Sequence, residues 1–187
     1  MCCKIALIGD SGVGKTDIIS RYSGDYSSNG ISYASKILIF DELDIKISLD
    51  IWDTAGQEKY QALTKFFYKD VSIAFLVYDI TNKQSFQNIK NYWYPQLKNF
   101  GEKDIIIGVV GNNVHLYEEE AVEEYEAREF AKSIGGFFEG VSTENNQGIN
   151  KLFMDAAQKY VNKKLEEEIK LNEKYNKIHK LKTYLRF

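Results

Sequence analysis

The chain has 187 residues, of which 44% are apolar, 14% aromatic and 27% charged, with a formal net charge of -3. This length and composition indicate one globular domain and exclude a low-complexity or fibrous chain. No apolar run approaches the roughly 20 residues that span a bilayer, and no signal-peptide pattern follows Met1, so we expect neither a transmembrane segment nor secretion. The two cysteines, Cys2 and Cys3, are adjacent, which favours an intracellular protein, cytoplasmic or peripheral on an assembly or membrane.

Short apolar or β-branched runs alternate with helix-like stretches along the chain. Near-continuous apolar runs are typical of strands that are buried on both faces. We expect strands at 4–9, 36–40, 45–52, 73–79, 105–111 and 137–142, with a hairpin at the "DELD" between the second and third. Helices are expected at 15–23, 85–99, 121–134 and from 147 onward. The alternation predicts an α/β fold: a doubly wound, mostly parallel six-stranded sheet with one antiparallel edge strand, plus a C-terminal helical extension.

A complete phosphate-binding motif follows the first expected strand. Residues 9–16 read GDSGVGKT, which matches G-x-x-x-x-G-K-[ST] between a strand and a helix. Glycines let successive backbone N–H groups turn toward phosphate oxygens, and the start of the helix adds its positive dipole end. Lys15 is expected to pair with the β- and γ-phosphates and the Thr16 hydroxyl to hold Mg2+. The predicted phosphate-binding residues are Ser11, Gly12, Val13, Gly14, Lys15 and Thr16; a chance glycine-rich turn is the disfavoured alternative.

A second motif, WDTAGQE, closes the strand expected at 45–52. With GDSGVGKT, and with VYDITNKQSF and EAREFAKSIGGFFEGVSTENNQGINKLF further along, it makes the chain resemble the Ras superfamily of small GTPases, the Rab branch most closely, from residue 4 to about 160. The resemblance implies a P-loop NTPase fold, GTP/GDP and Mg2+ as ligands, and a switch driven by the γ-phosphate.

The same resemblance assigns roles to individual residues. It implies that Asp53 holds Mg2+ through water, that the Gly56 amide contacts the γ-phosphate, and that Gln57 is the catalytic residue that orients the attacking water. The alternative for Gln57 is a solvated loop residue with no role. In switch I, Ser28 is the expected Mg2+ ligand, with Ser32 and Ser35 as rivals. Only 11 residues separate Ser28 from Thr16, which predicts a loop too short to close fully over the γ-phosphate.

The base-reading loops differ from the family pattern. Where the family has Asn-Lys-x-Asp, this chain has NNVH at 112–115, and STE at 142–144 replaces Ser-Ala-Lys. We predict that the base site consists of Asn112, Asn113, His115, Ser142 and Thr143, with a backbone N–H near Thr143 contacting the base oxygen.

This difference bears on guanine recognition. The resemblance assigns the Lys stem to covering the ring and the Asp carboxylate to the guanine N1–H and 2-amino group. Asn113 is too short for the first role, and His115 offers at most one acceptor nitrogen for the second. Losing one or two charge-assisted hydrogen bonds predicts about 10- to 1000-fold weaker guanine binding. Two alternatives stay open: a rearranged loop that binds GTP weakly, or altered nucleotide binding.

The C-terminal segment has a character of its own. Residues 161–187 hold eight Lys or Arg against four Glu, a net charge of +4, which leaves -7 for residues 1–160. We therefore divide the chain into a G domain, 1–160, and a basic amphipathic helix, 161–187. A break in the apolar spacing near 169–171 predicts a kink or a stutter. The apolar side chains repeat along one side of this expected helix. This pattern favours a helix that binds an anionic membrane, an acidic groove or a partner helix over one packed back on its own domain.

No cysteine follows Cys3, so we expect no prenyl anchor. Acylation of Cys2 and Cys3 is disfavoured against burial at a strand start. The aromatic segment at 91–100 is expected to pack Trp93 and Tyr94 on the sheet, and no nucleic-acid partner is expected.

Two functions follow from these patterns. The first is a Rab-like small GTPase, slow in hydrolysis, that binds protein partners through its switch regions and its C-terminal helix. The second is a degenerate GTPase whose nucleotide, if bound, is structural, serving as an adaptor subunit docked through residues 161–187.

Overall fold

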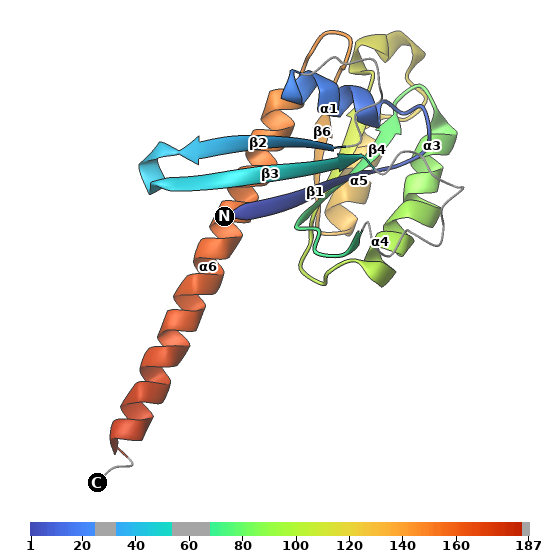
Figure 1. Ribbon diagram of the computed structural model, residues 1–187. Helices are drawn as coiled ribbons and strands as arrows, with labels where there is room; N and C mark the ends of the chain where they lie inside the picture. The colour runs from blue at the N-terminus through green and yellow to red at the C-terminus, as the bar shows by residue number, and fades with distance from the viewer. Residues whose placement is uncertain (25–32, 54–67, 185–187) are drawn as a thin grey trace.

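A six-stranded sheet forms the centre of the molecule (Figure 1). The computed structural model describes residues 1–24, 33–53 and 68–184, with side chains up to residue 175. Within these ranges the strand order is β2-β3-β1-β4-β5-β6, with β2 antiparallel to β3 at one edge and the other pairings parallel, as the sequence predicts. The strands are β1 (Cys2–Ile8), β2 (Tyr33–Phe40), β3 (Ile45–Asp53), β4 (Ile73–Asp79), β5 (Ile106–Asn112) and β6 (Phe137–Gly140).

Helices cover both faces of the sheet (Figure 1). The α-helices are α1 (Lys15–Ser23), α3 (Lys83–Asn88), α4 (Tyr94–Phe100), α5 (Glu124–Ser133) and α6 (Ile149–Tyr184). A π-helical turn, η3 (Ile89–Trp93), joins α3 to α4, so the helix expected at 85–99 is present with a widened turn inside it. Short 3-10 helices form at η1 (Asp41–Leu43), where the hairpin was expected, and at η4 (Val114–Glu119).

Apolar side chains alternate between the two faces of the buried strands and so form two hydrophobic layers. In β1, Ile5 and Leu7 face the layer that α1 and α6 cover, whereas Ile8 faces the layer under α3, α4 and α5. Because side chains alternate between the faces of a strand, a strand that is buried on both sides reads as an unbroken apolar run. Trp93 and Tyr94 pack in the second layer, as expected.

The two cysteines lie within β1 and differ in burial. Cys3 is buried, as predicted, but Cys2 is exposed and its thiol donates to Asp50 Oδ2 at 3.2 Å, so the prediction was wrong for Cys2. That hydrogen bond and partial burial raise the pKa of Cys2, and burial raises the pKa of Cys3 to about 12. Both thiols therefore stay protonated near neutral pH, and neither is an activated nucleophile.

The C-terminal helix leaves the domain as one unbroken element (Figure 1). Val161 is fully buried and Leu165 packs against the core, but Ile169, Leu171 and Tyr175 are 58%, 66% and 68% exposed. The expected kink or stutter is absent: six residues of helix turn Leu171 about 120° away from Leu165, so the apolar spacing changes face while the backbone stays regular. Up to Tyr175 the helix does not fold back on the domain. None of the described helices is long and apolar enough to cross a membrane.

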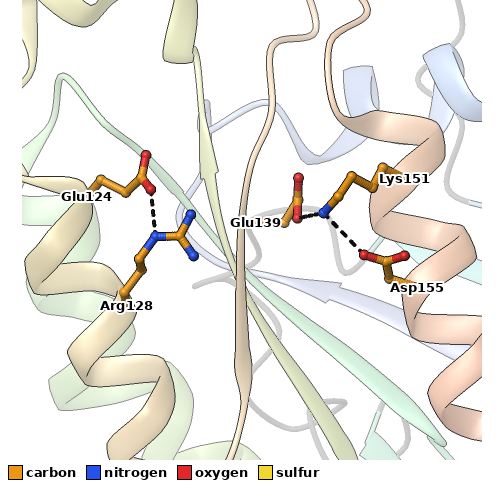
Figure 2. Close-up of polar contacts among 5 residues, drawn as sticks. All are labelled: Glu124, Arg128, Glu139, Lys151 and Asp155. Carbon is orange, nitrogen blue, oxygen red and sulfur yellow. Dashed lines mark hydrogen bonds and ion pairs between the residues drawn. The ribbon is translucent and has the colours of Figure 1, made fainter.

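Ion pairs connect α6 to the sheet (Figure 2). Lys151 pairs with Glu139 of β6 and, at 3.1 Å, with Asp155 one turn along α6; the first contact raises the pKa of Lys151. In α5, Arg128 pairs with Glu124 at 2.5 Å, and both side chains are more than half exposed. Exposed pairs contribute about 0.2 to 1 kcal/mol each, so the buried layers, not these pairs, stabilise the fold.

Candidate functional site

The glycine-rich loop forms a cavity where β1 meets α1. The cavity has a volume of about 390 Å³ and is lined by Ser11, Gly12, Gly14, Lys15, Thr16, Asp17 and Asp53. Five of the six loop residues expected to bind phosphate are therefore together on its wall, and the side chain of the sixth, Val13, packs in the core. Backbone N–H groups at the first turn of a helix suit anions.

Gly14 is required both by backbone conformation and by space. Its φ is +89°, in the left-handed region where only glycine is free of strain, and it caps α1. A Cβ at this position would lie 2.1 Å from Nδ2 of Asn112, the last residue of β5. The loop and the end of β5 thus touch through a contact that tolerates no side chain.

Lys15 lies inside the loop and is only 4% exposed. Its Nζ donates to the carbonyl oxygens of Gly9 at 2.9 Å and Asp10 at 2.6 Å, which fixes the ammonium group over the cavity. A buried cation among inward-turned N–H groups is chemically suited to a phosphate chain.

Thr16 and Asp53 meet on the other wall. The Thr16 hydroxyl donates to Asp53 Oδ2, and Asp53, at the end of β3, is 5% exposed. A hydroxyl beside a carboxylate supplies the hard oxygen ligands that Mg2+ prefers when phosphates and water complete its shell. The two residues expected to hold the metal are therefore adjacent and fit it.

Most of the remaining residues expected on the γ-phosphate side cannot be placed from the described ranges. Ser28, Gly56 and Gln57, and the rival Ser32, fall outside the described residues. Ser35 is described: it lies in β2, where it pairs with Asp50 and its hydroxyl donates to Asp50 Oδ1 at 3.1 Å. It is not among the residues that line the loop cavity, so the alternative that it binds the metal gains no support.

Asp10 is a residue of the loop whose role the sequence did not reveal. Its two carboxylate oxygens accept hydrogen bonds from Trp93 Nε1 and from Asn88 Nδ2, each at 2.7 Å. Trp93 closes the π-helical turn, so that turn aims the indole N–H at the loop. The loop is thereby anchored to the helix layer behind it.

At the base end, Asn112 connects the loop to β5. It is 1% exposed, and its Nδ2 donates to the Val13 carbonyl at 3.0 Å. Its Oδ1 is buried without a hydrogen-bond partner within the described part of the chain. Since buried polar atoms are rarely left unpaired, this orphaned acceptor fits a ligand that donates to it.

Beyond Asn112, the predicted base residues cluster in two hydrogen-bonded pairs. Asn113 adopts a left-handed φ of +68° and donates from Nδ2 to Asp79 Oδ2 at 2.9 Å. His115 Nδ1 lies 2.8 Å from Ser142 Oγ. Thr143 follows Ser142 in the loop after β6, so all five predicted base residues lie at the carboxyl ends of β5 and β6.

A second, larger cavity of about 560 Å³ lies at the opposite end of the sheet. It is lined at the amino ends of β4 and β5 and along α6, by charges of both signs such as Asp104, Lys163 and Glu167. No residue of the motifs lines it. In open α/β sheets ligands bind outside the carboxyl ends of the strands, which favours the smaller cavity as the candidate site.

Comparison with known proteins agrees with this site. Residues 4–162 match the family model "Ras: Ras family". The chain is 36% identical to Ras-related protein Rab-21 of Homo sapiens over 162 residues, covering 84% of this chain and 72% of that protein. It is 38% identical to Ras-related protein RABA4a of Arabidopsis thaliana over 156 residues, covering 80% and 68%. With this match, the chain belongs to the Ras family and is a Rab-like small GTPase.

Proposed function

We propose that this protein is a nucleotide-dependent switch that binds a nucleoside di- or triphosphate together with Mg2+. The observation that carries the proposal is the loop cavity, in which Lys15, the start of α1 and the Thr16–Asp53 pair converge. These groups supply the cation, the backbone donors and the hard oxygen ligands that a Mg2+-bound phosphate chain needs.

Each residue has a distinct task in this proposal. The N–H groups of residues 11–16 bind the phosphate oxygens, Lys15 neutralises the β- and γ-phosphates, and Thr16 with Asp53, the latter through water, holds the metal. The metal, when bound, neutralises charge on the β- and γ-phosphates. Gln57 orients the attacking water, and the Gly56 amide contacts the γ-phosphate. When hydrolysis removes the γ-phosphate, this contact is lost and the segment around Gly56 is released.

The base contacts are the finer part of the proposal. Asn112 offers its unpaired Oδ1, Thr143 a backbone N–H, and Asn113, His115 and Ser142 complete the wall. The nucleotide is a guanine nucleotide by family, but its selection is weaker than in a site with the Asn-Lys-x-Asp motif.

Protein partners contact the switch regions and the C-terminal helix, residues 161–187, which we treat as a docking element distinct from the G domain. Exposed Leu171 and Tyr175 on a helix with a net charge of +4 support this role. The alternative of an adaptor without a nucleotide cycle has no support from the comparisons, since each protein named above is Ras-related.

Single-turnover hydrolysis tests the proposal. The full chain is loaded with GTP and Mg2+, and phosphate release is followed for the wild type and for Gln57→Leu. We expect a slow wild-type rate and a rate about 100-fold lower in the variant, in line with loss of a positioned catalytic group. Equal rates would remove Gln57 from the mechanism, and no GTP binding at millimolar concentration would reject the switch itself.

A further inference from the structure

The Ser142 hydroxyl determines which nitrogen of His115 carries the proton. Ser142 is fully buried, and its Oγ already accepts the Asn145 N–H at 3.2 Å. A serine hydroxyl carries one proton that also needs an acceptor. Within the part of the chain that the structure describes, the acceptor at hydrogen-bond distance is His115 Nδ1, 2.8 Å away. The hydroxyl proton therefore goes to Nδ1.

An accepting Nδ1 fixes the other ring nitrogen as a donor. The neutral imidazole then carries its proton on Nε2, and the imidazolium also has a proton there. Nε2 makes no hydrogen bond with the described residues, and the ring is only half-buried, so this N–H is available to a ligand.

The position of His115 gives that donor a function. It follows Asn112, whose side chain holds the Val13 carbonyl of the phosphate loop, and it packs beside Ser142 after β6. A nucleotide with its phosphates in the loop extends along the carboxyl ends of the strands, as ligands of such sheets do. The base thus comes to the carboxyl ends of β5 and β6, where His115 lies beside Ser142.

We propose that His115 is a specificity-determining residue that makes this site read the 2-position of a 6-oxopurine as an acceptor rather than as a donor. This inference rests on the proposed function above. Guanine carries a donating amino group at C2, hypoxanthine only a hydrogen, and xanthine an accepting carbonyl oxygen. All three share the 6-oxo group and the N1–H; guanine and hypoxanthine differ only at C2, whereas xanthine also carries an N–H at N3.

An N–H at this place inverts the order that a carboxylate would impose. A carboxylate accepts from the 2-amino group and favours guanine, whereas Nε2–H meets that amino group donor to donor. The 2-oxo group of xanthine accepts a hydrogen bond from Nε2–H. Hypoxanthine, with only a hydrogen at C2, neither makes this hydrogen bond nor opposes it. One net hydrogen bond is worth about 3- to 10-fold in affinity. We therefore expect xanthosine diphosphate to bind most tightly, inosine diphosphate next and guanosine diphosphate least tightly, with steps of that size.

The test is a calorimetric titration of the full chain with the three diphosphates in the presence of Mg2+. His115→Asp restores an acceptor and is expected to reverse the order, with guanosine diphosphate bound at least about 10-fold more tightly than inosine diphosphate. Ser142→Ala releases Nδ1, so the ring can present an accepting Nε2, and the preference for xanthosine diphosphate is expected to shrink about 3-fold or more. Tyr117→Phe, an exposed neighbour in η4, is the matched control and keeps the wild-type order.

The outcomes separate this inference from the proposal it rests on. Wild-type selection of guanosine over inosine diphosphate by about 10-fold or more, or an unchanged order in a folded His115→Asp, would overturn the assignment to His115 while leaving the switch intact. Failure of all three diphosphates to bind would overturn both.

Discussion

The phosphate end and the base end of the site differ in what recognises the ligand. In the proposed site, backbone N–H groups, one lysine and an oxygen pair recognise the phosphates, and these residues follow one another in the chain or meet at the ends of neighbouring strands. At the base end, the proposed recognition comes from side-chain donors and acceptors, and their roles depend on hydrogen bonds such as the one between His115 and Ser142. A family can therefore keep its phosphate chemistry unchanged while its base selection diverges.

The largest effect is expected from Lys15→Ala. Removing a buried, doubly hydrogen-bonded cation weakens diphosphate binding about 100-fold or more, since its loss leaves phosphate charge unpaired. If the phosphate end and the base end act independently, the affinities for guanosine, inosine and xanthosine diphosphates fall by the same factor, which titration measures. Lys132→Ala, a lysine in the last turn of α5, is the control. Unequal weakening would show that the two ends are not separate.

Gly14→Ala is expected to disturb the contact that joins the ends. The new Cβ meets Asn112 Nδ2 and forces a strained φ, at a cost of about 2 to 4 kcal/mol in unfolding free energy, measured by urea denaturation. Gly135→Ala controls for strain alone, because its φ is +70° with nothing within 4 Å of the added Cβ, and it should cost about 1 kcal/mol. Equal costs in the two variants would remove the clash with Asn112 from the account.

Removal of Mg2+ with a chelator is expected to act at the phosphate end only. Loss of the metal held by Thr16 and Asp53 weakens the binding of all three diphosphates by about 10-fold, which is the size of one strong charge interaction. The order among the bases stays the same. A change in that order on chelation would contradict the assignment of the metal to this pair.

Trp93→Phe is expected to have the smallest effect. The ring still packs in the second layer, but Asp10 loses the indole hydrogen bond, which lowers the unfolding free energy by about 1 to 2 kcal/mol. Trp52→Phe, at a partly exposed position in β3, controls for the loss of an indole. If both variants unfold at the same urea concentration, the anchor of the loop through Asp10 contributes nothing.

Sequence predicts the phosphate end well because its signal is local. The loop, the helix start at Lys15 and the strand end at Asp53 are set by adjacent residues and by alternation of apolar side chains. The sheet order and the antiparallel edge strand follow for the same reason. The helix through residues 169–171 also obeys local hydrogen bonding, and the change of apolar spacing there reflects two faces of one helix rather than a break.

At both ends of the site, the hydrogen bonds that resisted prediction are long-range. His115 and Ser142 are 27 residues apart, and Asp10 and Trp93 are 83 apart, so neither pair leaves a spacing pattern in the chain. A lone His in place of an acidic residue indicates a changed specificity, but only the buried Ser142 hydroxyl assigns its tautomer. The exposed thiol of Cys2 was missed because its partner, Asp50, comes from a neighbouring strand.

The central claim is that the loop cavity binds a Mg2+-nucleotide. It is tested most directly by denaturing the purified full-length chain and identifying released nucleotides by chromatography, followed by titration of the emptied protein with guanosine and inosine diphosphates. The account predicts about one purine nucleoside phosphate per chain, or saturable rebinding that Lys15→Ala abolishes. A chain that releases no nucleotide and binds none at millimolar concentration, with wild type and Lys15→Ala indistinguishable, would contradict it.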